Sequence, residues 1–112
     1  AELASLTTTG RKSGKEREVP LVRGHDGDNV VFIASKSGHP THPLWYLNLV
    51  ANPAVKVQIG DEVKSYTART AEGEERERLW KMMTGLYADY ENYAKWTDRE
   101  IPVVVCEPAS NA

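Results

Sequence analysis

The chain has 112 residues, 40% of them hydrophobic and 27% charged, and its formal net charge is −2. This length predicts one domain over residues 1–112. The composition excludes a disordered tail or a membrane-spanning protein, since no apolar run approaches the roughly 18 residues that cross a bilayer. The lack of a cationic surplus argues against nucleic-acid binding, and a single cysteine, Cys106, excludes an internal disulfide and fits a reducing cytoplasm.

The first part of the chain is predicted to form strands, because its apolar and β-branched residues fall in short runs. Strands are expected over residues 3–9, 18–23 and 29–35. The sequence His-Asp-Gly-Asp at 25–28 predicts a hairpin turn between the last two strands. A short helix is expected over 44–51, where Pro43 suits the first helical position.

The rest of the chain predicts a second hairpin, two helices and a final strand. Apolar and polar residues alternate over 54–59 and 63–69, on either side of a Gly-Asp turn. Apolar residues at helical spacing predict a helix from Thr70 to about Tyr87, and a shorter helix is expected over 89–97. A valine run predicts a strand over 101–106 that is buried on both faces. About six antiparallel strands and three short helices give an α+β, mainly β fold, whose sheet is expected to curl into a small barrel.

The segment 7–17 carries the strongest local signal for ligand binding. It holds four cations, two glycines and several hydroxyl groups. Glycines let backbone N–H groups turn inward and arginine offers a bidentate fork, so the segment predicts a cradle for phosphate or carboxylate. Its spacing does not match the phosphate loop of nucleoside triphosphatases, because only three residues separate Gly10 from Gly14. The alternative is a solvated, charged hairpin loop.

A second candidate segment runs over 34–48, from a strand end through a loop into a helix. Backbone N–H groups at such a junction, together with Lys36, suit an anionic or electron-rich ring. Trp45 and Tyr46 are expected either to form the floor of a planar-ligand site or to pack in the core. His39 and His42 stand three residues apart, but no third ligand is near them in the sequence, so we expect no metal site.

A third candidate is an aromatic stripe in which Tyr87, Tyr90, Tyr93 and Trp96 follow one another at intervals of three residues. On a helix they would share one face, either as core packing or as a wall for an aromatic substrate. Buried phenol groups need hydrogen-bond partners. No Gly-x-Ser-x-Gly nucleophile motif is present, and Cys106 in its valine-rich strand is expected to be inert.

Several motifs, taken together and in order, resemble one family. They are Leu-Thr-Thr-Thr-Gly-Arg-Lys-Ser-Gly at 6–14 with Arg17 and Pro20-Leu21, Ala-Ser-Lys at 34–36, Pro-Leu-Trp-Tyr-Leu-Asn-Leu at 43–49, Asn-Pro at 52–53, Trp-Thr-Asp-Arg at 96–99, and Ile-Pro-Val-Val-Val-Cys-Glu-Pro at 101–108. The chain is similar over nearly its whole length to the deazaflavin (coenzyme F420)-dependent nitroreductase family of actinobacteria. The resemblance implies a split β-barrel related to flavin-mononucleotide-binding barrels, with coenzyme F420 as the cofactor.

The resemblance also implies roles for particular residues. Those implied to hold the phosphate and glutamyl tail of the cofactor are Arg11, Lys12, Ser13 and Arg17. Those implied to border the deazaflavin ring or pack on the cofactor are Ile33, Ala34, Ser35, Lys36, Leu44, Trp45, Tyr46, Leu47 and Asn48. Those implied to contact the substrate and to assist catalysis are Ser35, Tyr87, Tyr90 and Tyr93.

The activity implied by the resemblance is hydride transfer from reduced coenzyme F420 to a menaquinone-like quinone, or to a nitroaromatic or nitroimidazole acceptor. Val22 stands where the characterised nitroreductase has a tyrosine, which leaves reduction of nitro drugs open. Three alternatives remain: a non-catalytic carrier of a deazaflavin or flavin, a nicotinamide or flavin-mononucleotide enzyme on the same barrel, and a structural domain whose basic loop touches lipid or a partner. We expect a cytoplasmic monomer or weak homodimer. Because the chain begins at Ala1, we also expect a preceding segment through which the protein contacts the inner face of the membrane.

Overall fold

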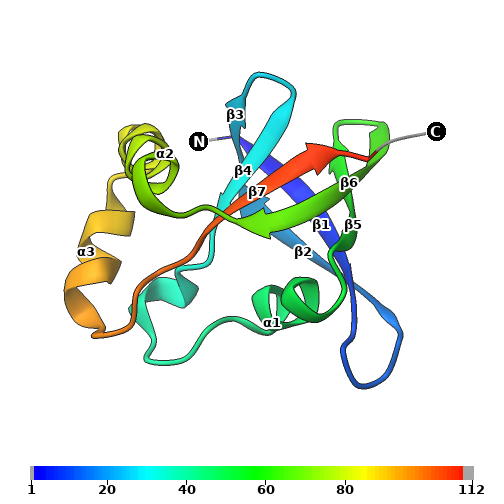
Figure 1. The fold of residues 1–112 in the computed structure, drawn as a ribbon, viewed down its shortest axis with the longest axis horizontal. Helices are drawn as coiled ribbons and strands as arrows, with labels where there is room; N and C mark the ends of the chain where they lie inside the picture. The colour runs from blue at the N-terminus through cyan, green and yellow to red at the C-terminus, as the bar shows by residue number, and fades with distance from the viewer. Residues whose placement is uncertain (1, 110–112) are drawn as a thin grey trace.

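Seven strands form one antiparallel sheet in this computed structural model, which describes residues 2–109. The strands are β1 (Leu3–Thr9), β2 (Glu16–Val22), β3 (Gly24–Asp26), β4 (Asn29–Ile33), β5 (Ala54–Ile59), β6 (Glu62–Thr70) and β7 (Val103–Pro108). The helices are α1 (Leu44–Ala51), α2 (Gly73–Leu86) and α3 (Asp89–Trp96), with a short 3₁₀ turn, η1 (Lys36–Gly38), after β4. Figure 1 shows α2 and α3 together on one side of the sheet and α1 apart from them.

The sheet is curled rather than flat. Its strand order is β2-β1-β5-β6-β7-β4-β3, and β2 at one edge also contacts β4 near the other edge. Curling protects the two edges, which would otherwise expose unpaired backbone groups. The α+β split β-barrel predicted from the sequence is therefore confirmed.

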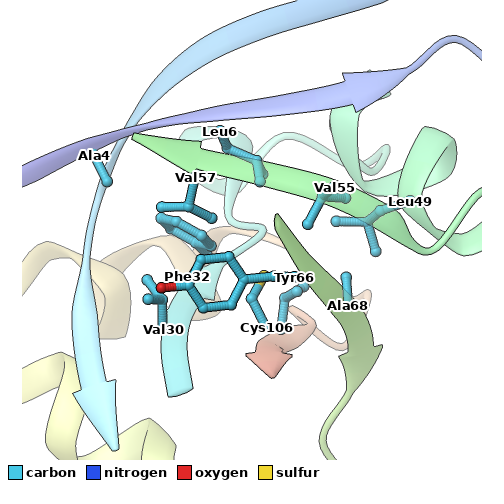
Figure 2. Packing of buried hydrophobic residues seen from close by; sticks show 11 residues of the cluster. Ala4, Leu6, Val30, Phe32, Leu49, Val55, Val57, Tyr66, Ala68 and Cys106 are labelled. Atoms are coloured by element: carbon cyan, nitrogen blue, oxygen red, sulfur yellow. The ribbon is translucent and has the colours of Figure 1, made fainter. Parts of the chain in front are cut away.

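The interior of the curled sheet holds the first of two hydrophobic clusters. Along β1 the buried residues Ala4, Leu6 and Thr8 alternate with more exposed neighbours, as a strand with one face on a core requires. Figure 2 shows Phe32 and Tyr66 packed in the centre of this cluster. This burial fixes which face of β1 points inward. The β1–β2 loop follows directly after Thr9, the last residue of this strand.

The second cluster lies between the outer face of β4 and β7 and the helices α2 and α3. Val103 and Val105 point into it, whereas Val104 points into the first cluster. The valine run is thus buried on both faces, as its sequence predicts. Leu79 and Met83 of α2 complete this second core.

The structure differs from the sequence prediction in the number and bounds of its elements. There are seven strands rather than six, because His25 and Asp26 belong to β3 and the turn is confined to Gly27-Asp28. Helix α2 begins at Gly73 rather than at Thr70, because Thr70 still pairs with Val104 in the sheet. Strand β7 begins at Val103 rather than at residue 101, because Pro102 has no N–H to donate to the sheet.

Candidate functional site

A cleft of about 730 Å³ opens between the β1–β2 loop, η1 and the start of α1. Its lining consists of Gly10, Arg11, Lys12, Ser13, Arg17, Val19, Lys36, Pro43, Leu44, Trp45 and Asn48. Four of these side chains are cationic, and several others are apolar. The cleft is therefore chemically two-sided and suits a ligand with both an anionic part and a flat apolar part.

The β1–β2 loop is built by its glycines. The N–H of Gly14, whose φ is +71°, donates to the carbonyl of Gly10 at 2.9 Å, and the N–H of Gly10 donates to the carbonyl of Lys15 at 2.8 Å. A side chain at Gly10 would place its Cβ 2.6 Å from Ser13 Oγ. The left-handed backbone at residue 14 thus favours glycine, a Cβ at residue 10 would require Ser13 to move, and the turn places Arg11, Lys12 and Arg17 at the cleft.

The positive charge of the cleft has no carboxylate partner in the part of the chain described. None of the ion pairs formed within residues 2–109 includes Arg11, Lys12, Arg17 or Lys36. By contrast, the neighbouring Lys56 pairs with a glutamate at 3.4 Å. Uncompensated cations gathered around one cleft attract a multiply charged anion.

The loop is fixed to α1 by Asn48, which is buried with an exposed fraction of 6%. Its side-chain oxygen accepts the backbone N–H of Arg11 at 3.2 Å and the Arg11 Nη1 donor at 3.5 Å. Its Nδ2 donates to the buried Thr8 Oγ1 at 3.4 Å. One buried amide therefore joins β1, the basic loop and α1, and orients Arg11 at the cleft.

The predicted site residues do not all lie on this cleft. The structure brings together Arg11, Lys12, Ser13, Arg17, Lys36, Leu44, Trp45 and Asn48. Ile33 and Ala34 are buried, Ser35 directly precedes η1, and the hydroxyl of Tyr46 is 2.9 Å from Thr70 Oγ1. Leu47 lies on the same helix as Trp45 but outside the lining.

The three predicted tyrosines form a cluster of their own on and before α3. The hydroxyls of Tyr87 and Tyr93 are 3.2 Å apart, and the ring of Tyr90 packs edge-on against Tyr87 at 4.9 Å between centroids. The Tyr87–Tyr93 hydrogen bond raises the pKa of Tyr87 to about 12, and burial raises the pKa of Tyr90 to about 12. These groups therefore stay protonated at neutral pH. They line no part of the cleft, but Gly38 of η1 packs directly on Tyr93.

No site role was predicted from the sequence for three lining residues, Gly10, Val19 and Pro43, although Gly10 and Pro43 lie in the candidate segments 7–17 and 34–48. Val19 and Pro43 contribute apolar surface to the cleft. For Val19 a sequence signal existed, because it is an apolar residue between Glu18 and Pro20 in the predicted strand 18–23, and the structure leaves it half-buried. Within residues 2–109 no three His, Cys, Asp or Glu side chains gather as a metal site, and no helix is long and apolar enough to cross a membrane.

Comparison with known proteins now places the chain. A family model described as F420H(2)-dependent quinone reductase matches residues 1–108. This chain belongs to that family. An F420H(2)-dependent quinone reductase of Mycobacterium tuberculosis is 40% identical over 103 residues, which cover 89% of this chain and 69% of the relative. The family resemblance found in the motifs is therefore confirmed, and its name specifies a quinone.

Two solved structures agree with this family assignment. An F420-H2 dependent reductase, FDR-A, is 50% identical and superposes with a TM-score of 0.87, covering 94% of this chain and 93% of that chain. A protein described as a domain-swapped dimer is also 50% identical, with a TM-score of 0.88, covering 94% of this chain and 79% of that chain. The chain is thus a member of an oxidoreductase family whose named cofactor is coenzyme F420.

The residues present fit that cofactor. Coenzyme F420, as the sequence resemblance implied, joins a flat deazaflavin ring to an anionic phospholactyl-glutamate tail. The cleft offers the cations Arg11, Lys12 and Arg17 for the anionic part, and the indole of Trp45 with Leu44 for the flat part. Leu44 is 66% exposed, so its side chain is available to a ligand.

Proposed function

We propose that this protein reduces a quinone by hydride transfer from reduced coenzyme F420, and that the cleft between the β1–β2 loop and α1 is the cofactor site. The observation that carries the proposal is that four cations, which form no ion pair within residues 2–109, meet exposed apolar surface in one cleft of about 730 Å³. A nicotinamide dinucleotide fits less well, because the Gly-x-Gly-x-x-Gly motif is absent from the sequence.

The tail of the cofactor would be held by Arg11, Lys12 and Arg17, with the hydroxyl of Ser13 as a further donor. Arginine pairs with phosphate or carboxylate through two parallel hydrogen bonds, which fixes direction as well as charge. Asn48 supports this by holding the backbone of Arg11. Lys36 of η1 adds a fourth cation to the cleft.

When bound, the reduced cofactor supplies the hydride. The chain's contribution is to hold the ring against Trp45 and Leu44, to exclude water from it, and to orient the acceptor. Ser35 and the tyrosine hydroxyls of Tyr87 and Tyr93 would donate hydrogen bonds to the acceptor oxygen as negative charge builds on it. Tyr90 is buried and packs edge-on against Tyr87, so it would support the ring of Tyr87 rather than contact the acceptor itself.

The first test is a titration of the purified chain with coenzyme F420, with binding expected at a Kd on the order of micromolar. A double change, Arg11→Gln with Lys12→Gln, should abolish binding while the melting curve is preserved. The matched control is Lys56→Gln with Lys64→Gln, which removes two exposed cations outside the cleft. If the wild-type chain does not bind the cofactor, or if the cleft double variant binds it normally, the proposed site is wrong.

The second test separates an enzyme from a carrier. Reduced coenzyme F420 is mixed with the protein, and its reoxidation is followed after a menaquinone analogue or a nitroimidazole is added. We expect catalytic turnover with the quinone, and nitroaromatic reduction as the slower activity. Binding without turnover on any quinone would identify a carrier instead.

A further inference from the structure

Arg99 lies just after α3 and outside the cleft, and its guanidinium forms hydrogen bonds with several groups of one loop. Its Nε donates to the carbonyl of His39 at 2.8 Å, its Nη1 donates to the carbonyl of Ala34 at 3.1 Å, and its Nη2 donates to the carbonyl of Ser35. Nη1 is also 3.0 Å from Nδ1 of His42. All four partners lie within residues 34–42, a loop that is 57 to 65 positions earlier in the chain.

The loop that Arg99 holds has an unfavourable backbone conformation. Lys36 and Ser37 have φ values of +46° and +51°, and Gly38 follows with +77°. The left-handed region is costly for residues with a side chain, so two such residues in succession persist only where their surroundings fix them. The N–H of Gly38 donates to the same Ser35 carbonyl that accepts Nη2 of Arg99. Arg99 therefore binds the atom that closes the turn.

This loop carries residues that the proposed function needs. Lys36 lines the cleft, and Ser35 is the proposed donor to the acceptor. Arg99 itself is not part of the cleft lining. Its half-buried guanidinium takes part in no ion pair within residues 2–109, and its hydrogen-bond partners there are backbone carbonyls and a histidine. The planar guanidinium offers several N–H donors in fixed directions, so it can bind several carbonyls at once. A lysine ammonium is a single point charge and lacks this fork.

We propose that Arg99 is a positioning residue that holds the 34–42 loop in its left-handed turn and thereby sets Ser35 and Lys36 beside the bound cofactor. The inference rests on the proposed function, since it assigns the loop to that site. The cofactor tail is held by a separate element, the β1–β2 loop. Loss of Arg99 should therefore impair the chemical step more than cofactor binding.

The test compares Arg99→Gln with a matched control, Arg76→Gln. Arg76 of α2 donates to the carbonyl of Ile101 at 2.7 Å and pairs with Glu100 at 3.1 Å, so it holds the segment next to Arg99, but none of its hydrogen bonds or ion pairs within residues 2–109 reaches the 34–42 loop. With F420H2 and a menaquinone analogue, Arg99→Gln should lower kcat by on the order of 10- to 100-fold, because small misplacements of reacting groups have effects of this size. The Kd for F420 should change less than kcat, and Arg76→Gln should leave kcat near the wild-type value.

Two further measurements make the result specific. Hydrogen exchange on the chain without ligand should show faster exchange at the amides of Gly38 and His39 in Arg99→Gln, but not in Arg76→Gln. Arg99→Lys should recover kcat only in part.

The proposal is overturned if kcat and exchange in Arg99→Gln match those of Arg76→Gln, or if Arg99→Lys restores full activity. If the wild-type chain does not bind or oxidise F420H2, while Arg99→Gln still shows the faster exchange at Gly38 and His39, the proposed function is refuted instead.

Discussion

The side-chain oxygen of Asn48 accepts the backbone N–H of Arg11 across 37 residues of sequence, at 3.2 Å. Because Asn48 is buried and Thr8 beside it is also buried, this amide is a polar group inside an otherwise apolar contact between β1 and α1. Buried polar groups persist when their partners satisfy them. Here one partner of the Asn48 amide is Arg11, a cation of the cleft. Both the packing of α1 on β1 and the binding of a ligand therefore depend on the Asn48 side chain.

Replacing Asn48 with Ala should therefore lower both the stability of the fold and the affinity for the cofactor. The change leaves the Arg11 N–H and the Thr8 hydroxyl without a protein partner, which should cost about 1–3 kcal/mol of unfolding free energy. Cofactor affinity should fall as well, because Arg11 is no longer oriented. Denaturant unfolding and F420 titration measure the two effects. The control is Asn52→Ala, which removes a hydrogen bond from a half-buried amide to the carbonyl of Thr9 at 3.5 Å and should have a smaller effect on both.

Cofactor affinity should also depend strongly on salt. The cations Arg11, Lys12 and Arg17 are exposed, so added salt screens their attraction for an anionic tail. Raising the ionic strength from about 0.1 M to about 1 M should weaken F420 binding by at least tenfold, since the screening length falls from ~10 Å to ~3 Å. Arg17→Gln should reduce the slope of this dependence, whereas Lys64→Gln should not. A Kd independent of salt would mean that the tail is not bound through these charges.

The sequence predicts where the cleft lies better than it predicts which other residues contribute to the site. The segment 7–17 predicted an anion cradle, and the segment 34–48 predicted a site for an anionic or electron-rich ring, because glycine spacing and charge are local properties. Arg99 lay within a motif shared with the family, but its partners are far away in the chain and no periodicity links them. The stripe of Tyr87, Tyr90 and Tyr93 was recognised by its spacing, yet spacing alone cannot tell that η1 lies between α3 and the cleft.

The pH dependence of the loop should follow from His42. Arg99 donates to Nδ1 of His42, so this nitrogen must be unprotonated, and the ring of Tyr46 packs at 5.0 Å on another side. Burial, together with the charge of Arg99, lowers the pKa of His42 below its usual 6.5. The unfolded chain therefore binds this proton at a higher pH than the folded chain does, and stability is lost as pH falls from 6.5 toward the folded pKa.

Turnover should fall at lower pH than 6.5, around and below the lowered pKa of His42 in the folded protein, because protonation there places a second cation against Arg99. His42→Gln, which offers an amide oxygen and does not titrate, should shift the acid limb of the pH profile to lower pH. Initial rates with a quinone, measured on both proteins across the acid range, check this. An unchanged acid limb in His42→Gln would assign the limb to another group.

Cys106 should be chemically silent in the folded protein. Its side chain is fully buried in the first core cluster, and burial raises the pKa of its thiol to about 12. The thiolate that reacts with alkylating or disulfide reagents is therefore absent at neutral pH. Labelling with a thiol reagent should proceed only in denaturant, at the rate of unfolding. Rapid labelling of the native chain would contradict the packing of β7.

Gly38, the last residue of η1, should tolerate no side chain. Its φ of +77° disfavours any side chain, and a Cβ there would lie 2.9 Å from the carbonyl oxygen of Tyr93 and 3.2 Å from Cβ of Trp96. Gly38→Ala should destabilise the fold by about 1–3 kcal/mol, as strain at a left-handed position does. It should also displace η1 from α3, so quinone reduction should fall together with stability.

Gly85, near the end of α2, provides the matched control because nothing lies within 4 Å of a Cβ placed there. Gly85→Ala should stabilise the helix by about 0.5–1 kcal/mol, since alanine loses less backbone entropy than glycine does. Melting temperatures and steady-state rates of both variants separate the two effects. A Gly38→Ala variant as stable and as active as Gly85→Ala would show that the contact between η1 and α3 is not needed for the site.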